Sequence, residues 1–487
     1  MYSIKNPKKV ISHILLVWTF LLFHSFTSKA QYTINDTFGD LVECDTMTRG
    51  IFIIWWDKND NLTNEVDALL DTMLSYRNTC LDVLNMEDPP NTPDGFFYNV
   101  YLHGNGFFST NGWGNGQGTD SNGYPFLTLP SGILSDHTNT AHETFHIFQY
   151  SANAPGFSYA GDSQWYIEAS ANWFAARQNP NALRRFVEAE SLVRVPQVPF
   201  WLSFNNYPNT YPNNWQRYVH QYALALHLYY LTDVVGINED IITSGLFSGT
   251  TELPQEYMYN IIGSVDYRKY FIDWAAHMTN DFDFIPANQA ATNLNEWNTY
   301  ADPVDDNEFV AEYINEGTNG WITPDDDKVT NAWSFNTYKL INSQTEIYTF
   351  EVNGNLTGSY GGNSFFQGKV LVKNSVSGDS FYDLDMVDDY QGSLSLALTP
   401  DDAEVYFIIA AMPEVFEDDN PTFQLFPYMM KIELGESTPV SNIDAALEKV
   451  EVARFNLLGQ KIESRVEGFQ IILYEDGSVE KVYEIIE

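Results

Sequence analysis

The spacing of apolar residues in the first 130 positions predicts several strands and one helix. Residues 50–56 are β-branched and aromatic, as in a buried strand, and 64–86 then repeats apolar residues every three or four positions, as on one helical face. Residues 96–102 and 124–129 predict two more strands, joined by a glycine-rich loop at 104–123. Prolines near both ends of the last strand predict that it lies at a sheet edge.

From residue 135 to about 300, apolar positions recur with the period of an α-helix. The predicted helices are 138–150, 164–177, 182–193, 215–231 and 267–280. An acidic, glycine-containing linker follows at 301–331. From 332 the pattern changes to strands separated by short turns, as in 348–352 and 405–409, which predicts a β-sandwich ending near 436. The expected fold class is α+β, with a mixed sheet over a helical lobe.

The N-terminal 30 residues have the composition of a secretory signal peptide. Lys5, Lys8 and Lys9 precede the apolar run 14–23, and the small residues Ser28 and Ala30 offer a cleavage site. The run has about ten residues, whereas a membrane span needs roughly twenty. We therefore expect an exported chain, secreted or at the cell surface, with no transmembrane segment in the mature protein.

The charge of the chain restricts its partners. It carries 65 acidic against 24 basic residues, a net charge of −41 at pH 7, which disfavours nucleic acid and anionic membrane surfaces. The acidic clusters 325–327 and 417–419 are candidates for Ca²⁺, but neither has the alternating oxygen spacing of a calcium loop. A solvated acidic face is the simpler expectation for each.

The chain has two cysteines, Cys44 and Cys80, and neither stands in a CxxC pair or near a cluster of histidines. In an exported protein a disulfide between them is one expectation. A pair of buried thiols is the other, because sequence separation does not determine whether the two side chains meet.

A metal-binding pattern stands inside the predicted helix 138–150. The motif HETFH spaces His142 and His146 by four residues, so that both imidazoles lie on one helical face and can bind one metal ion. Glu143 follows the first histidine, where its carboxylate can reach a water at the ion. Catalytic zinc takes three protein ligands. Glu168, in an apolar run of the next helix, supplies a third ligand whose burial needs a neutralising partner.

These residues resemble the gluzincin branch of the zincin metallopeptidases, in which HExxH is followed by a glutamate on the next helix. The resemblance spans roughly residues 45–300 and implies a zinc peptidase with one Zn²⁺ ion. Its implied ligands are His142, His146 and Glu168, and its implied general base is Glu143. The expected substrate is an extracellular protein or peptide.

The resemblance also implies residues around the metal. Relatives carry a tyrosine or histidine on a later helix that stabilises the oxyanion, and Tyr222 and His220 are the candidates here. Some relatives place an aspartate where this chain has Asn172, which can still accept a hydrogen bond from an imidazole N–H. The predicted edge strand 124–129 is expected to pair with an extended substrate.

The C-terminal segment 441–487 is short and β-rich. It contains Asn-Leu-Leu-Gly-Gln-Lys at 456–461, a glycine before the strand 468–473, and a last turn at Gly477. This resembles the C-terminal sorting domains of Bacteroidetes proteins that leave the cell by type IX secretion. The resemblance implies the type IX machinery as a partner.

Several functional alternatives stay open beside the peptidase. The chain could be a cell-surface binding or adhesive protein with a catalytically silent zincin scaffold, or a different zinc hydrolase that trims a peptide linked to glycan or cell wall. The expected parts are a signal peptide at 1–30, a metallopeptidase domain at 31–300, a linker at 301–331, a β-sandwich accessory domain at 332–436 and a sorting domain at 441–487.

Overall fold

The structure is a computed structural model of the 487-residue chain. It describes residues 44–89, 98–103, 115–119, 125–130, 136–159, 161–183, 186, 192, 196, 198–199, 220–292, 310–314, 320–341, 345–356, 364–402, 404–416, 425–434, 451–456, 461–462, 468–474 and 479–484. The chain divides into two compact units, Met1–Leu434 and Gly435–Glu487. The expected signal peptide lies outside the described residues.

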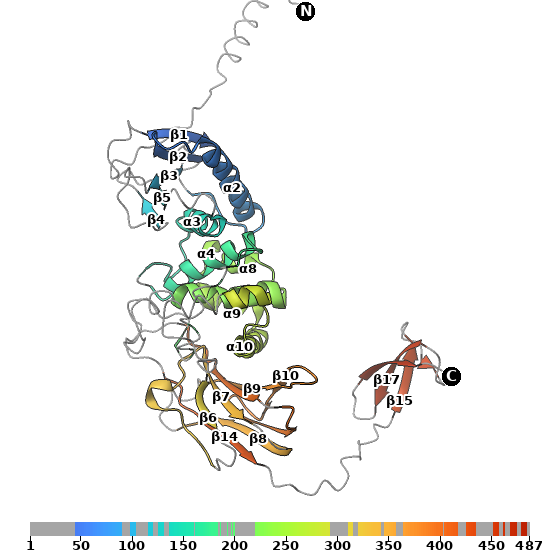
Figure 1. The fold of residues 1–487 in the computed structure, drawn as a ribbon. Helices are drawn as coiled ribbons and strands as arrows, with labels where there is room; N and C mark the ends of the chain where they lie inside the picture. The colour runs from blue at the N-terminus through green and yellow to red at the C-terminus, as the bar shows by residue number, and fades with distance from the viewer. Residues whose placement is uncertain are drawn as a thin grey trace, which may run out of the picture. The chain divides into compact units, whose positions relative to one another are not determined.

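A five-stranded mixed sheet opens the first unit (Figure 1). Its strands are β1 (Cys44–Arg49), β2 (Phe52–Asp57), β3 (Tyr98–His103), β4 (Asn115–Thr119) and β5 (Pro125–Pro130), in the spatial order β1-β2-β3-β5-β4. Neighbours β2, β3 and β5 run parallel, and the outer pairs are antiparallel. Helix α2 (Thr63–Asp82) packs on one face through the apolar positions that its periodicity predicts, including Val66, Leu70 and Met73.

The sheet order corrects one prediction. Strand β5 lies between β3 and β4, so the predicted edge strand 124–129 is an interior strand. Pro125 and Pro130 are its first and last residues, where a missing N–H leaves the ladder between them intact. The edge on this side is β4, which comes from the glycine-rich segment expected to be a loop.

Helices fill the middle of the first unit. They are α3 (His137–Gln149), α4 (Gln164–Gln178), α7 (Ala225–Tyr229), the π-helix η7 (Tyr230–Val235), α8 (Asp240–Phe247), α9 (Pro254–Ile262) and α10 (Ser264–Thr279). Helices α3, α4 and α10 match the predicted helices 138–150, 164–177 and 267–280 closely. The predicted helix 215–231 is described from His220 onward, and it is interrupted at Leu224. Most of the predicted helix 182–193 lies outside the described residues.

Two antiparallel-rich sheets follow the helices. Their strands are β6 (Val310–Ile314), β7 (Ser334–Ile341), β8 (Glu346–Asn353), β9 (Phe366–Lys373), β10 (Ser380–Asp383), β11 (Asp385–Met386), β12 (Gln391–Leu398), β13 (Glu404–Ala411) and β14 (Met429–Leu434), with a 3₁₀ turn η8 at Asp326–Lys328. The sheet orders are β10-β9-β13-β7-β6 and β11-β12-β8-β14. The sheets face each other across a shared core, where the rings of Phe350 and Phe407 lie 5.6 Å apart. Strand β6 lies in the segment expected to be a linker.

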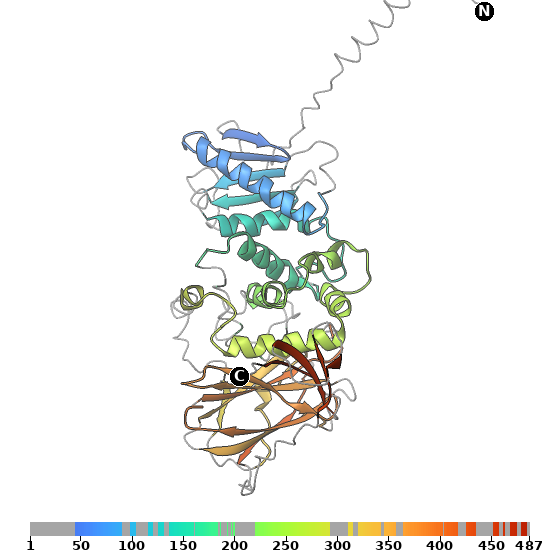
Figure 2. The ribbon, with the colours of Figure 1, turned by 90° about the vertical axis from the view of Figure 1, so that its right-hand side faces the viewer.

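The helices and these sheets share one apolar core. Helix α10 lies against β9 and β13 (Figure 2), and Trp333 packs between Tyr259, Tyr267 and Phe271. Buried Arg268 donates from Nε to the Met412 carbonyl oxygen at 3.0 Å. The expected boundary at 301–331 is therefore not a gap between separate cores.

The second unit contains one four-stranded antiparallel sheet among its described residues. Its strands are β15 (Glu451–Asn456), β16 (Lys461–Ile462), β17 (Gly468–Tyr474) and β18 (Val479–Glu484), in the order β16-β15-β17-β18. The turn residues 457–460 that carry the sorting-domain resemblance lie outside the described residues.

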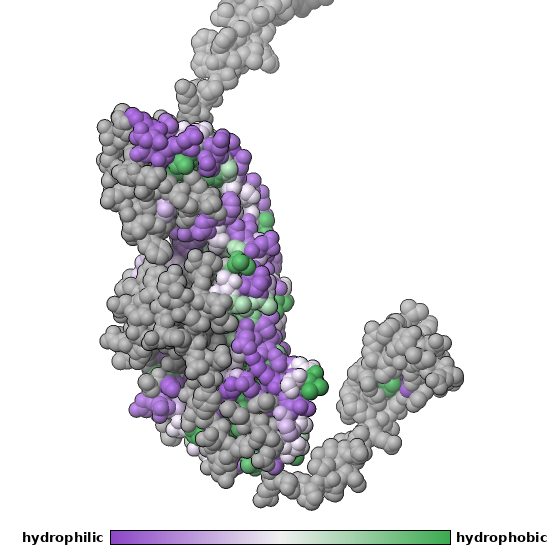
Figure 3. Space-filling view, viewed as in Figure 1, coloured by the Kyte–Doolittle hydropathy of each residue, from purple (hydrophilic) through white to green (hydrophobic). Residues whose placement is uncertain are grey.

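The described surface over α2 and β1 is mostly hydrophilic, with apolar side chains scattered singly (Figure 3). Among the described residues, no helix is both long and apolar enough to cross a membrane. Cys80 is a buried thiol, and no disulfide joins it to Cys44.

Candidate metal centre

Helix α3 carries the HETFH motif through the centre of the first unit. Asp136 caps its N-terminus, because its Oδ1 accepts hydrogen bonds from the backbone N–H groups of Thr138 and Asn139 at 3.1 and 3.2 Å. The helix lies between α2 and α4, and all of its residues from 140 to 149 are buried. A polar motif on such a helix needs partners inside the protein.

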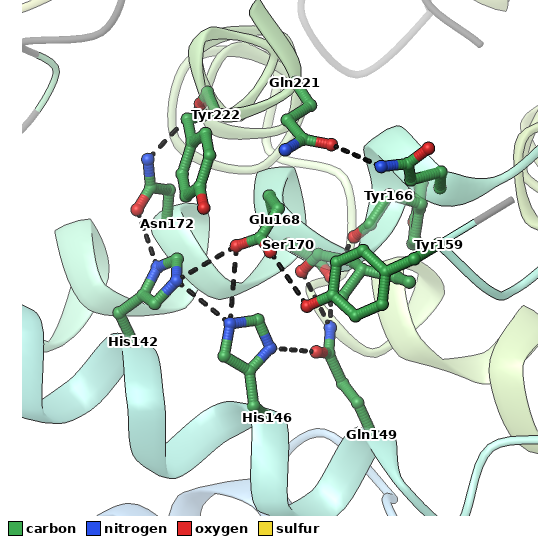
Figure 4. A network of polar contacts seen from close by, with 12 residues as sticks. His142, His146, Gln149, Tyr159, Tyr166, Glu168, Ser170, Asn172, Gln221 and Tyr222 are labelled. Carbon is green, nitrogen blue, oxygen red and sulfur yellow. Dashed lines mark hydrogen bonds and ion pairs between the residues drawn. The ribbon is translucent and has the colours of Figure 1, made fainter. Parts of the chain in front are cut away.

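Three ligand-type atoms converge between α3 and α4 (Figure 4). The Nε2 atoms of His142 and His146 are 3.0 Å apart. Glu168 Oε2 lies 3.2 Å from the first Nε2 atom and 3.4 Å from the second. The three sequence-predicted ligands therefore form one buried cluster.

The far nitrogen of each imidazole contacts an amide oxygen. His142 Nδ1 lies 2.7 Å from Asn172 Oδ1, and His146 Nδ1 lies 2.7 Å from Gln149 Oε1. Gln149 is itself oriented by donating from Nε2 to the Ile167 carbonyl oxygen and to Ser170 Oγ. An amide oxygen only accepts hydrogen bonds, so each Nδ1 carries a proton. A ring that is neutral and protonated on Nδ1 presents a lone pair on Nε2.

The cluster consequently brings together three acceptors. Two imidazole lone pairs and one carboxylate oxygen point at the same small volume, and Glu168 Oε2 has no hydrogen-bond donor among the described residues. Such an arrangement is repulsive unless a positive charge lies between the three atoms. Two histidines and one carboxylate are a ligand set of catalytic zinc, so these residues fit a divalent metal ion.

The electrostatics of the cluster agree with this fit. Burial lowers the pKa of His146, but the charge and hydrogen bond of Glu168, the charge of Glu143 and the hydrogen bond to Gln149 together outweigh burial and raise that pKa to about 9. Burial also opposes ionisation of Glu168, yet the two imidazoles hold the pKa of Glu168 well below its usual range. The carboxylate is therefore ionised, and the site attracts positive charge.

Glu143 is buried beside the cluster. It follows His142 on α3, and its charge contributes to raising the pKa of His146. The structure thus places a second carboxylate near the three ligand atoms, at the position where the sequence predicts the general base.

The two oxyanion candidates have different surroundings. Tyr222 stacks on the imidazole of His142, with ring centroids 5.8 Å apart, and its hydroxyl end is directed toward the ligand atoms (Figure 4). The Tyr222 carbonyl oxygen also accepts a hydrogen bond from Asn172 Nδ2 at 3.4 Å. His220 is fully buried. Tyr222 is therefore the candidate that adjoins the cluster.

A protein-family model described as a family of unknown function, DUF6055, matches residues 52–438. The chain belongs to this DUF6055 family. A search of curated proteins found no match. Among solved structures, an M60 catalytic domain with two CBM51 domains from Clostridium perfringens ZmpB matches with 8% identity over 99% of this chain and 70% of that chain, at a TM-score of 0.28. The pre-peptidase C-terminal domain of a Bacillus anthracis collagenase matches with 9% identity over 25% of this chain and 93% of that chain, at a TM-score of 0.16.

The DUF6055 match includes the metal cluster and the two packed sheets. It ends before the strands β15 to β18 of the second unit. The family is thus defined by the part of the chain that forms one continuous core.

The DUF6055 site also contains a residue that sequence reasoning missed. Tyr159, in the loop before α4, donates its hydroxyl proton to Glu168 Oε1 at 3.0 Å. No periodicity marks a loop residue, and the HETFH motif does not include it. Its proximity to Glu168 in sequence, between glycines at 156 and 161, is the only local signal.

Proposed function

We propose that this DUF6055 protein is a zinc-dependent metallopeptidase of the gluzincin type. One observation carries the proposal: His142, His146 and Glu168 direct three lone pairs at one buried point, while amide oxygens fix the protons on the opposite ring nitrogens. Three such atoms can share one point only around a positive charge, and two imidazoles with one carboxylate are a ligand set of catalytic zinc. Glu143 beside the cluster favours a catalytic site over a structural one.

The residues divide the work of peptide hydrolysis. Bound zinc would supply a Lewis acid and lower the pKa of a water ligand to about 7. Glu143 accepts the proton of the attacking water and then delivers it to the leaving amine as the peptide bond breaks. Its position one residue after a ligand keeps the carboxylate close to the reacting atoms without making it a ligand.

Tyr222 is proposed to stabilise the oxyanion. Its ring is held against His142 and its hydroxyl end is directed at the cluster. A hydroxyl donor aimed at developing negative charge contributes a few kcal/mol to transition-state stabilisation, roughly 3 kcal/mol in measured cases. His220 remains the second candidate for this role.

Strand β4 is proposed to bind the substrate backbone. As the edge strand it offers backbone groups on one side, and it contacts α3, the helix that carries both histidines. A peptide that extends the sheet along β4 would therefore run beside the metal ligands. This replaces the expectation that residues 124–129 form the edge.

Export of the chain, as its N-terminal sequence predicts, would place its substrate outside the cell. We propose that the chain acts on extracellular protein or peptide and that its second unit directs it to type IX secretion. The compact β-rich second unit supports a separate sorting domain. Removing residues 441–487 should retain the protein in the periplasm if this assignment is right; unchanged secretion would contradict it.

The direct test is metal content and peptidase activity of the purified protein. We expect about one zinc per chain by plasma mass spectrometry, and cleavage of unfolded casein that a chelator abolishes. Glu143→Gln should retain zinc and lose turnover, because it removes a proton acceptor but no ligand. His146→Ala should lose both.

The controls separate the alternatives. Zinc binding without cleavage of any peptide would favour a silent scaffold or a hydrolase with a different substrate. Absence of zinc from the wild-type protein refutes the proposal. Loss of zinc from Glu143→Gln would show that the roles of ligand and base are assigned wrongly.

A further inference from the structure

The two carboxylate oxygens of Glu168 have different partners. Oε2 faces both imidazole Nε2 atoms at 3.2 and 3.4 Å. Oε1 instead accepts a hydrogen bond from Tyr159 Oη at 3.0 Å (Figure 4). A carboxylate that can bind a metal through either oxygen is thereby held with one oxygen toward the ligand cluster.

The loop that carries Tyr159 is tightly built. The Gly156 carbonyl oxygen accepts from the backbone N–H groups of Ser158 and Ser163 at 2.9 and 3.1 Å. A Cβ atom on Gly161 would lie 2.2 Å from that same oxygen, so only glycine fits there. The loop therefore closes on itself and has little room to rearrange.

A second set of contacts braces the loop from outside. Gln255 on α9 accepts a hydrogen bond from Ser163 Oγ at 3.0 Å and donates from Nε2 to the Asp162 carbonyl oxygen at 3.2 Å. The same Nε2 donates to the Phe416 carbonyl oxygen, which follows β13. The position of Tyr159 thus depends on α9 and on the packed sheets as well as on α4.

Tyr159 is exposed to solvent, although its hydroxyl donates to a buried carboxylate. The residue is 53% exposed, whereas Glu168 is only 4% exposed. Removing the hydroxyl alone would therefore leave no cavity in the core, so its effect can be measured without unfolding the protein.

We infer that Tyr159 is a positioning residue that holds Glu168 as a one-oxygen ligand of the metal ion. The inference rests on the proposed zinc site and adds a residue that the HExxH motif and its glutamate do not specify. Hydrogen bonds to metal ligands orient them and contribute to metal affinity, typically by a factor of 10 to 100. Tyr159 acts here through the carboxylate and does not itself contact the ion.

The test is zinc affinity of the full chain, measured by competition with a chromophoric chelator. Tyr159→Phe should weaken zinc binding by about tenfold or more. Tyr382→Phe on β10, an exposed tyrosine outside the cluster, should leave affinity unchanged. Circular dichroism of the metal-free variants should match that of the wild type.

Two further readouts separate positioning from a general loss of structure. In a Glu168→Ala background, Tyr159→Phe should have no additional effect on zinc affinity, because its target is gone. With Co²⁺ in place of zinc, the visible absorption of Tyr159→Phe should weaken, because release of Oε1 allows a fifth ligand atom and leaves tetrahedral geometry.

The outcomes are distinct from those that test the proposed function. If the wild-type protein binds zinc and Tyr159→Phe binds it equally well, the inference is wrong and the zinc site stands. An equal loss from Tyr159→Phe in both backgrounds would also overturn it. If the wild-type protein binds no zinc, the proposed function fails and this inference fails with it.

Discussion

At the scale of single residues, the site is defined by what lies behind its ligands. His142 and His146 each direct Nδ1 at a side-chain amide, and Glu168 directs its second oxygen at a tyrosine hydroxyl. Neutral partners of this kind orient the ligands without adding charge to the site. The negative charge of the cluster therefore comes from Glu168 and the nearby Glu143.

Substitution of Asn172, the hydrogen-bond partner of His142, should either weaken or strengthen zinc binding. Asn172→Leu removes the acceptor for Nδ1–H and should weaken zinc binding by about tenfold or more. Asn172→Asp places a carboxylate at the same position, makes the imidazole more basic and should strengthen zinc binding. Competition with a chelator measures both. Equal affinities in the two variants would show that this hydrogen bond does not orient the ligand.

His227 makes stability depend on pH. It is fully buried beside Tyr267, Phe271 and Trp274, and burial lowers its pKa to about 3. Below about pH 6.5 the unfolded chain binds a proton on this histidine that the folded chain excludes, so stability falls with pH from there to about pH 3. The stabilising contribution of neutral, buried His227 is fully present above about pH 6.5, the pKa of histidine in the unfolded chain.

Replacing His227 with leucine should remove this pH dependence of stability. Between pH 7 and pH 5 the wild type should lose about 2 kcal/mol more unfolding free energy than His227→Leu. Urea unfolding of both proteins at the two pH values, with a chelator present, measures the difference. The same pH dependence in both would show that this residue is not the source.

At the scale of elements, local pattern and long-range pairing differ in how well sequence predicts them. The helices α3 and α4 follow from periodicity and from a motif that needs a helix, so the cluster of His142, His146 and Glu168 was predictable. Strand order depends on partners distant in the chain. The interior position of β5 and the presence of β6 could not be derived from alternation of apolar residues. Tyr159 was missed for a similar reason, because a loop has no period.

The edge strand gives a test of substrate binding. A peptide-like inhibitor should slow amide hydrogen exchange in β4 (Asn115–Thr119), because its backbone would pair with the open side of that strand. Strand β1, the opposite edge of the same sheet, is the matched control and should exchange at its original rate. Protection of β1 instead of β4, or of neither, would place the substrate elsewhere.

At the scale of the whole molecule, the first unit is joined by its core and by charges at the same interface. Lys369 on β9 is buried and pairs with Asp273 on α10 at 2.7 Å and with Asp383 at 2.5 Å. Arg268 on the same helix places its guanidinium 3.7 Å from the centre of the Phe365 ring. The sheets therefore support helix α10 through apolar and charged contacts together.

Arg268 should be the most sensitive charged residue of this interface. Arg268→Met leaves the buried Met412 carbonyl oxygen without its donor and should cost about 1 to 3 kcal/mol of unfolding free energy. Lys269→Met, its exposed neighbour, should cost less than about 0.5 kcal/mol. Urea unfolding compares them. Equal losses would indicate that the contact between α10 and the sheets contributes little.

The shared core also determines how the molecule can be divided for study. A recombinant fragment that stops at residue 300 would bring Tyr259, Tyr267 and Phe271 into contact with water, because Trp333 and Phe416 now cover them. Such a fragment would contain every proposed zinc ligand and still expose an aggregation-prone apolar surface. The shortest piece expected to stay in solution as a folded catalyst therefore extends to Leu434.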